Sequence, residues 1–132
     1  MDTTSIELVD SEIEKINIEG DVITIYFNRA YIEKTMSDSV EITRWWQAGQ
    51  LIFQNAELIG DLPPFPAICT GGDVSESVYT YRDMIPLPLK GAGRATCLLK
   101  IKDTEQVIQV EAEEVEMVMI DRPQYIKHIR QS

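Results

Sequence analysis

Apolar and polar residues alternate along most of the chain, and the clearest example lies between Ile16 and Phe27. The alternation continues on both sides of Gly20-Asp21, which is typical of a hairpin with a two-residue turn. The expected cross-strand pairs are Glu19 with Val22, Ile18 with Ile23, Asn17 with Thr24 and Ile16 with Ile25. A shift of one residue would put apolar side chains opposite polar ones. The pattern therefore predicts this register, with the four isoleucines on a buried face.

A second hairpin is predicted over residues 95–101 and 107–110, with Asp103-Thr104-Glu105 as its turn. Ala95, Cys97, Leu99 and Ile101 fall on the face expected to be buried. A further strand is expected from Val115 to Ile120. Its inward face would carry Val115, Met117 and Met119.

The middle of the chain has weaker patterns. Residues 44–58 fit one long strand or two, with Leu51 and Phe53 pointing inward and Gly49 as a candidate bulge. Residues 74–85 alternate as one strand. Residues 60–73 hold three prolines and three glycines, so they are expected to form a loop with Cys69 near its exposed end.

Together these segments predict about seven to nine short strands with turns at regular spacing. Such a pattern indicates a mainly β protein, either an antiparallel barrel or a two-sheet sandwich. One short C-terminal helix is allowed after Pro123, where Tyr125, Ile126 and Ile129 would share a face. The length of 132 residues fits a single β domain over residues 1–132.

The charge narrows the range of partners. Twenty-two acidic residues against twelve Lys and Arg give a formal net charge of -10, which repels nucleic acid and anionic membranes. A basic protein is a permitted partner. No export signal and no long apolar segment is visible, so we expect a cytoplasmic protein with two reduced cysteines.

Few residues suggest catalysis, and no catalytic residue, metal ligand set or cofactor is predicted. His128 is the only histidine, and Cys69 and Cys97 lack the spacing of a zinc site. The densest acidic cluster comprises Glu111, Glu113, Glu114 and Glu116. It fits a solvated edge that discourages aggregation better than a divalent-cation site, which would need oxygens from another element.

The aromatic residues are the best candidates for a binding surface. Trp45 and Trp46 are adjacent, so in a strand their side chains point to opposite faces. Phe65 lies in a proline-rich segment that restricts the unbound chain. The tentative binding set is Trp45, Trp46, Phe65, Tyr79 and Tyr81. The alternative is that these aromatics close the ends of a small barrel.

Three functions are compatible with these sequence features. The first is a non-enzymatic binding or interaction domain that engages a basic protein. The second is a carrier of an apolar small molecule, in which Trp45 or Trp46 lines a barrel pocket with Met84, Met117 and Met119. The third is an enzyme that uses carboxylates alone. The sequence leaves the oligomeric state open, a homodimer included.

Overall fold

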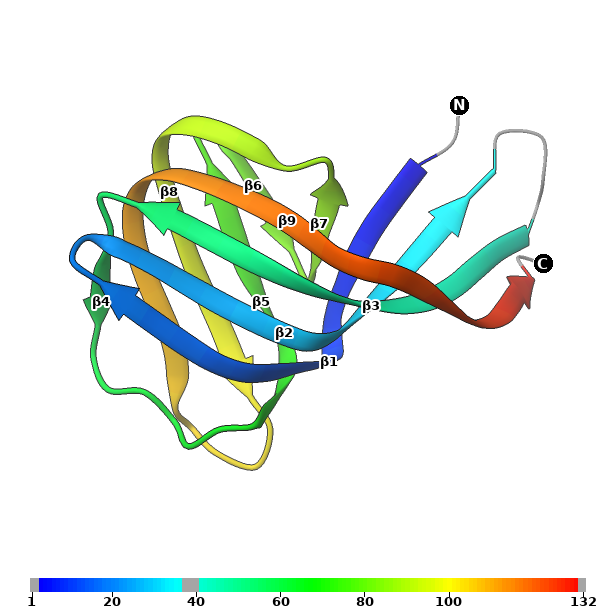
Figure 1. Cartoon of the computed structure of the whole chain (residues 1–132), viewed down its shortest axis with the longest axis horizontal. Helices are drawn as coiled ribbons and strands as arrows, with labels where there is room; N and C mark the ends of the chain where they lie inside the picture. The colour runs from blue at the N-terminus through cyan, green and yellow to red at the C-terminus, as the bar shows by residue number, and fades with distance from the viewer. Residues whose placement is uncertain (1–2, 37–40, 131–132) are drawn as a thin grey trace.

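The computed structural model describes residues 3–36 and 41–130, and every regular element in these two ranges is a β-strand. The strands in chain order are β1 (Thr3–Glu19), β2 (Val22–Thr35), β3 (Glu41–Gln54), β4 (Glu57–Ile59), β5 (Ala67–Glu76), β6 (Tyr79–Arg82), β7 (Met84–Leu87), β8 (Lys90–Ile101) and β9 (Val107–Arg130) (Figure 1). The mainly β, antiparallel fold expected from the sequence is confirmed. Four strands are longer than expected, because β1, β2, β3 and β9 contain 17, 14, 14 and 24 residues.

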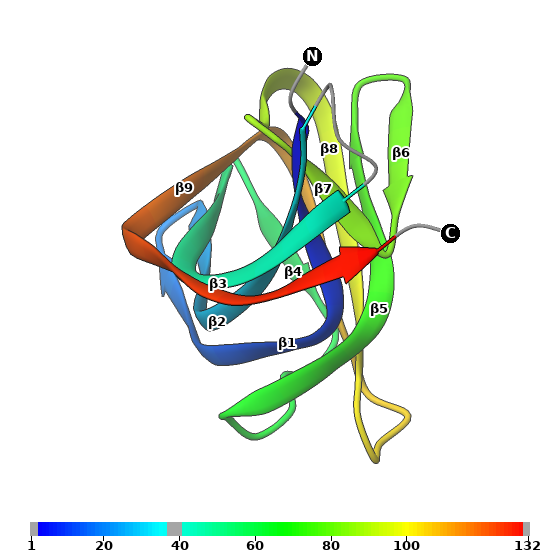
Figure 2. The ribbon, with the colours of Figure 1, turned by 90° about the vertical axis from the view of Figure 1, so that its right-hand side faces the viewer.

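The strands form one sheet that closes on itself. Neighbouring strands follow the order β5-β8-β9-β3-β2-β1, and β1 pairs with β5 to complete a ring. The strands of this ring surround a common interior, which Figures 1 and 2 show from two directions. Bulky side chains occupy that interior, among them the fully buried Phe27, Phe53, Leu51, Leu99 and Ile108. The result is a small barrel filled by its own side chains.

The first hairpin has the predicted register. Glu19 pairs with Val22, and Ile16 pairs with Ile25, as the alternation requires. Ile23 and Ile25 are buried, but Ile18 is 47% exposed. The burial prediction was wrong for Ile18 because the hairpin tip extends past the core. The second hairpin is also confirmed, with Cys97, Leu99 and Ile101 buried.

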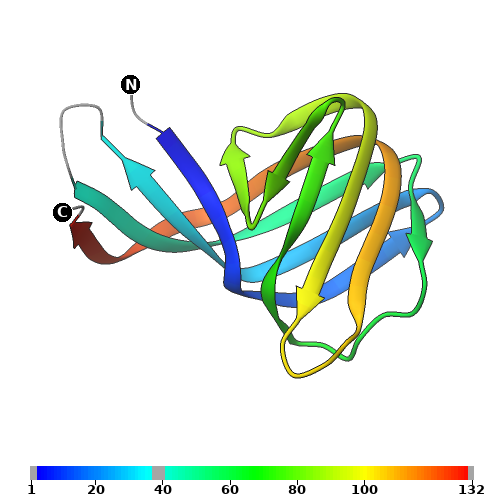
Figure 3. The same cartoon turned by 180° about the vertical axis from the view of Figure 1, so that it is seen from behind.

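Four strands continue beyond the barrel and form an open extension, which we call the arm. It comprises residues 3–7 of β1, 29–35 of β2, 41–47 of β3 and 121–130 of β9, and it projects to one side of the barrel (Figures 1 and 3). Its strands pair in the order β1-β2-β3-β9, and β7 pairs along the outer edge of β1. The sheet of the barrel and the sheet of the arm are therefore continuous.

The arm begins where all four strands carry irregularities in register. The pairing shifts between Glu7 and Glu12 of β1 and between Phe27 and Ala30 of β2. It shifts again on the β3–β9 pairing, between Trp46 and Ala48. Asp10 in β1 and Asp121 in β9 have φ angles of 72° and 62°. Bulges bend a strand and increase its twist, so a line of them across four strands turns the sheet out of the barrel.

The expected C-terminal helix is wrong, because residues 121–130 are the last part of β9. Three apolar residues in five positions fit a helix turn and a strand equally well over so short a segment. Pairing with β3 decides between them, since Trp45 lies opposite Tyr125 and Arg44 opposite Lys127. Pro123 is tolerated there because β9 is an edge strand beyond residue 116.

The segment 60–85 also differs from the expectation. Residues 67–73, expected in a loop, belong to β5, which pairs with both β1 and β8. Cys69 is consequently buried rather than exposed. Residues 74–85, expected as one strand, reverse direction after Glu76 to form the β5–β6 hairpin, with Ser77 at a φ of 57°. A local alternation cannot distinguish a continuous strand from a tight hairpin.

Residues 44–58 form two strands, and Leu51 and Phe53 point inward as predicted. Gly49 is buried in β3, and a Cβ there would lie 2.7 Å from Cε of Met117. The register shift is nearby, between Trp46 and Ala48. Gly49 therefore makes room for the Met117 side chain rather than forming the bulge itself.

Replacing Ile25 by Ala is expected to lower the free energy of unfolding by about 2–5 kcal/mol, the usual loss for truncating a packed core residue. Ile18→Ala in the same hairpin is the matched control. Because Ile18 is largely exposed, its loss should stay below about 0.5 kcal/mol. Urea unfolding measures both losses of stability. Equal losses would contradict the assignment of Ile25 to the core and of Ile18 to the exposed tip of the hairpin.

Candidate functional site

The two tryptophans lie on the arm and face opposite sides of its sheet, as their adjacency predicts. Trp45 packs against the hydrophobic core and makes an edge-to-face contact with Tyr125, with ring centroids 5.3 Å apart. Trp46 lies on the other face, near Arg29 and Tyr31. We call the Trp45 side the inner face and the Trp46 side the outer face.

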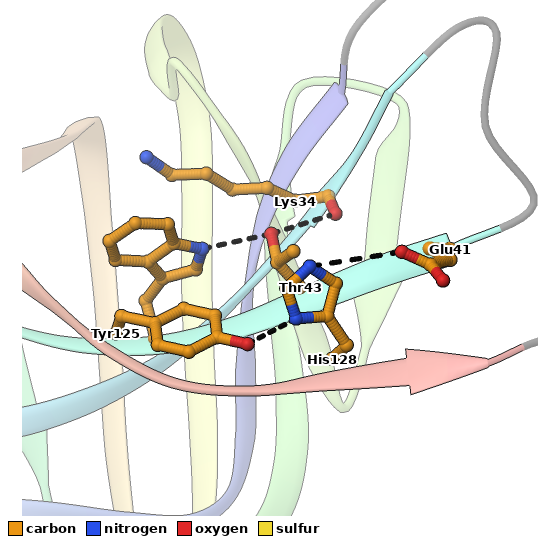
Figure 4. A network of polar contacts seen from close by, with 6 residues as sticks. Lys34, Glu41, Thr43, Tyr125 and His128 are labelled. Atoms are coloured by element: carbon orange, nitrogen blue, oxygen red, sulfur yellow. Dashed lines mark hydrogen bonds and ion pairs between the residues drawn. The ribbon is translucent and has the colours of Figure 1, made fainter.

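A network of polar contacts holds the inner face (Figure 4). The indole N–H of Trp45 donates a 2.9 Å hydrogen bond to Oγ1 of Thr43. The Lys34 ammonium lies 4.6 Å from the Trp45 ring centroid. His128 contacts the Tyr125 hydroxyl through Nδ1, and its Nε2 lies 3.7 Å from the Glu41 carboxylate. The aromatic side chains are therefore fixed by neighbours on β2, β3 and β9.

A groove of about 400 Å³ lies where the inner face meets the barrel. Met117, Met119, Leu87 and Pro88 supply apolar atoms, and Lys34 contributes a cation at its border. Two methionines predicted to line a ligand pocket thus share a groove, but it lies beside the arm rather than inside the barrel. The third, Met84, is exposed on β7.

The outer face carries two stacked cation–aromatic pairs. The Arg29 guanidinium lies 4.6 Å from the Trp46 ring centroid, and the Arg44 guanidinium lies 4.6 Å from that of Tyr31. These contacts restrict both the rings and the arginines. The pairs belong to a pocket of about 430 Å³, the outer pocket, lined by Asp10, Arg29, Tyr31, Arg44, Trp46, Ile126 and Lys127.

Glu7 borders the outer face and pairs with Arg44, with 3.5 Å between Oε2 and the guanidinium nitrogen. Burial raises the pKa of Glu7 above its ordinary value of 4.5, while the charge of Arg44 opposes the rise. The nearby Glu33 adds to the rise in the pKa. The folded protein therefore holds the Glu7 proton more tightly than an unfolded chain does.

Phe65 lies outside the arm. It belongs to the connection between β4 and β5, which starts on the side of the barrel far from the arm and runs to the first residues of β5, where Ala67 pairs with Ile13 of β1 (Figures 1 and 3). Its side chain is half-buried against the core. Pro63, Pro64 and Pro66 line a separate pocket of about 400 Å³ beside the β8–β9 turn. None of residues 60–66 lines the outer pocket or the groove beside Met117 and Met119, and the predicted site that joins Phe65 to Trp45 or Trp46 stays a prediction.

Tyr79 and Tyr81 lie on β6, an outer strand of the sheet. Their rings stack with centroids 6.4 Å apart. Tyr81 packs against the core, whereas Tyr79 is 59% exposed. Val78 in the adjoining turn is 86% exposed, so the β5–β6 hairpin also presents exposed apolar side chains.

The acidic cluster lies on the barrel wall. Glu111, Glu113 and Glu114 are exposed, and Glu111 pairs with Arg94 at 3.7 Å. Glu114 and Glu116 line a pocket of about 190 Å³ together with Lys90. Among residues 3–36 and 41–130, no group of three His, Cys, Asp or Glu side chains is placed to hold a metal ion.

The cysteines are free and buried. Burial raises the pKa of Cys69 to about 11 and raises the pKa of Cys97 still further. Both thiols are therefore protonated at neutral pH and act as small apolar side chains.

Charge is divided unevenly between barrel and arm. Residues 1–11, 28–48 and 120–132, which include the arm, hold six basic and seven acidic residues. The remaining segments hold six basic and fifteen acidic residues. The surplus of negative charge thus belongs to the barrel, and the arm segments are close to neutral.

The sequence interpretation identified both tryptophans but missed Arg29, Tyr31, Arg44 and Tyr125, which contact or adjoin them. Their cross-strand positions depend on the register shifts at the base of the arm. The sequence did contain an indication of these contacts, because aromatic and basic residues occur close together in residues 29–34 and 44–46.

Comparison with family models, curated proteins and solved structures finds no match to this chain. Within the described ranges, no helix is long and apolar enough to cross a membrane.

The raised pKa of Glu7 predicts a pH dependence of stability. The pKa of Glu7 is higher in the folded state than in the unfolded state. Between these two pKa values the folded state binds more protons, so the free energy of unfolding falls as the pH rises through that range. Glu7→Gln should remove this effect. The stability of the wild type minus that of Glu7→Gln should therefore decrease from pH 4 to pH 7 in urea unfolding. Glu14→Gln, at an exposed position of β1, is the control, and a flat or rising Glu7 difference would contradict the prediction.

Proposed function

We propose that this chain is a non-enzymatic protein-interaction domain and that the arm is its contact surface. The observation that carries the proposal is a four-stranded sheet that continues past the closed barrel, with ordered aromatic side chains on both faces. Its inner face is buried near β1 and β2, at Ile6, Ala30 and Ile32, but not along β9. On the arm, Tyr125 and Ile126 remain 49% and 38% exposed.

The composition of the arm supports the same conclusion. Tyr, Trp and Arg are enriched at protein interfaces and dominate binding energy where such interfaces exist. Trp45, Trp46, Tyr31, Arg29 and Arg44 all belong to the arm, and the cation–aromatic contacts hold them in place. Side chains that are already ordered lose less entropy on binding.

The expected preference for a basic partner applies to the barrel rather than to the arm. The barrel segments hold the surplus of acidic residues, with Glu111, Glu113 and Glu114 exposed on one wall. This charge would speed the approach of a basic protein and make association sensitive to salt. The arm segments, being close to neutral, impose no such preference.

A carrier of apolar small molecules is the second candidate, and the groove beside Met117 and Met119 favours it. Its volume of about 400 Å³ falls in the range of small-molecule sites. The interior of the barrel is a less suitable location, because fully buried side chains such as Phe27 and Phe53 occupy it.

The contact surface is tested by the double variant Tyr125→Ala/Ile126→Ala. Its matched control is Val78→Ala/Tyr79→Ala, which removes an exposed tyrosine and an exposed aliphatic side chain from the barrel. Each purified protein is immobilised and exposed to extract of the source cell, and retained proteins are quantified. We expect a specific protein that binds the wild type and the control, and binds the arm variant about tenfold less.

Thermal unfolding first confirms that both double variants remain folded, and Ile126→Ala alone serves if the loss of Tyr125 disturbs the arm. Equal retention by the wild type and the arm variant would contradict the proposed surface. Loss of retention in the control alone would assign binding to the β5–β6 hairpin instead.

A further inference from the structure

The inner face of the arm is hollowed where β9 separates from β8. The two strands pair as far as Lys90 and Glu116, and the last backbone bond runs from the Met117 N–H to the Leu89 carbonyl. Beyond this bond, within the described ranges, β9 pairs only with β3. The groove of about 400 Å³ lies here, and its apolar lining comes from Met117, Met119, Leu87 and Pro88. The groove therefore forms where the β8–β9 ladder ends.

The lining changes from apolar to polar along the groove. At the barrel end, a Cβ on Gly49 would lie 2.7 Å from Cε of Met117 and 3.1 Å from Sδ of Met119. The two methionines therefore fold into the space that Gly49 leaves free. Thr4 and Lys34 are cross-strand neighbours further out on the arm, and both line the groove. A groove with one apolar and one polar end fits an amphipathic molecule.

Lys34 supplies the hydrogen-bond donors of the polar end. Its ammonium lies 4.6 Å from the Trp45 ring centroid, and its side chain extends away from Glu41 (Figure 4). Its cross-strand neighbours, Thr4 and Thr43, are uncharged. Among residues 3–36 and 41–130, no carboxylate forms an ion pair with Lys34. The ammonium is therefore available to donate to a ligand.

The charges of the chain and of the groove favour an uncharged head group. The net charge of -10 opposes an anionic ligand, as it opposes nucleic acid. Lys34, the one charged residue among the described lining, repels a cationic ligand. An ammonium group donates hydrogen bonds and accepts none, so the head group must carry an acceptor. An alcohol or carbonyl oxygen meets these conditions and gains from a charged donor.

We propose that this groove binds an uncharged, lipid-like molecule. Its alcohol or carbonyl oxygen accepts a hydrogen bond from Lys34, and its apolar chain lies against Met117 and Met119. Flexible thioether side chains adapt to apolar partners of different shape. This inference goes beyond protein interaction and rests on the second candidate function, for which it specifies the class of ligand.

The methionine methyl groups allow a direct measurement by NMR. The chain has five methionines, and Met84, which is 36% exposed on β7, lies outside the lining of the groove. The probe is n-octanol, titrated into the full chain with isotope-labelled methionine methyl groups. We expect saturable shifts of the Met117 and Met119 signals and an unchanged Met84 signal. Shortening the probe by two methylenes, to n-hexanol, should weaken binding about tenfold.

Two lysine variants test the contact with the head group. Lys34→Leu removes the donors but keeps an apolar side chain, and it should weaken n-octanol about fivefold. Lys15→Leu is the matched control, because Lys15 also stacks on a ring, 4.8 Å from the centroid of Tyr26, and lies outside the groove. It should leave the affinity unchanged. Octanoate and octylammonium, which carry the same chain with charged heads, should each bind about fivefold more weakly than n-octanol.

Three results would overturn the proposal. The first is a Met84 shift equal to those of Met117 and Met119, or shifts that do not saturate, since contact would then be non-specific. The second is an equal affinity in Lys34→Leu and Lys15→Leu. The third is octanoate or octylammonium binding as tightly as n-octanol. Thermal unfolding first confirms that the variants are folded. If Lys34→Leu is not, Met119→Gln replaces it and should weaken n-octanol about fivefold by removing an apolar contact.

The experiment separates this inference from protein interaction. Tyr125 and Ile126 do not line the groove, so Tyr125→Ala/Ile126→Ala can abolish capture of a cellular protein while n-octanol still binds. Conversely, a groove that binds no n-octanol leaves capture by the arm intact.

Discussion

The bend across four strands decides the architecture of this protein. On the barrel side of the register shifts, the strands β1, β2, β3 and β9 join β5 and β8 in a closed ring with a filled interior. On the far side of these shifts, the same four strands leave the ring and form a sheet whose inner face is buried only in part, at residues such as Ile6 and Ile32. Bulges make this change of direction compatible with continuous pairing. The arm is therefore built on the rigid barrel rather than on a loop.

This constraint explains why aromatic and basic residues gather on the arm. Where the arm extends past the core, its sheet needs side chains that stabilise it without deep burial. Stacked pairs such as Arg29 with Trp46 and Lys34 with Trp45 do this, because a ring and a cation attract each other even when partly solvated. The same pairs present large, ordered surfaces to a partner. Under the proposed function, the contacts that stabilise the arm would also form its binding surface.

The sequence predicts local pairing well and long-range geometry poorly. Alternation gave the register of the first hairpin because Ile16, Asn17 and their partners lie within ten residues. It did not give the arm, whose base depends on shifts in four strands that are distant in the chain. Asp10 and Asp121 are polar residues that interrupt the alternation in the sequence. Only the strand pairing shows that both lie at the base of the arm.

The candidate site was predicted in part for the same reason. Adjacent tryptophans must face opposite sides of a strand, and that argument needs no knowledge of neighbours. The cations beside Trp45 and Trp46 come from other strands, so they could not be assigned from sequence. Phe65 was grouped with the tryptophans because of its loop, but that loop connects β4 to β5 outside the arm, and none of residues 60–66 lines the outer pocket beside Trp46.

Hydrogen exchange of the free and partner-bound protein tests the central claim most directly. If the arm is the contact surface, binding should slow exchange in residues 29–35, 41–47 and 121–130. Exchange in β5, β6 and the connection at residues 60–66 should stay unchanged. New protection confined to β6 or to that connection, with none on the arm, would contradict the account.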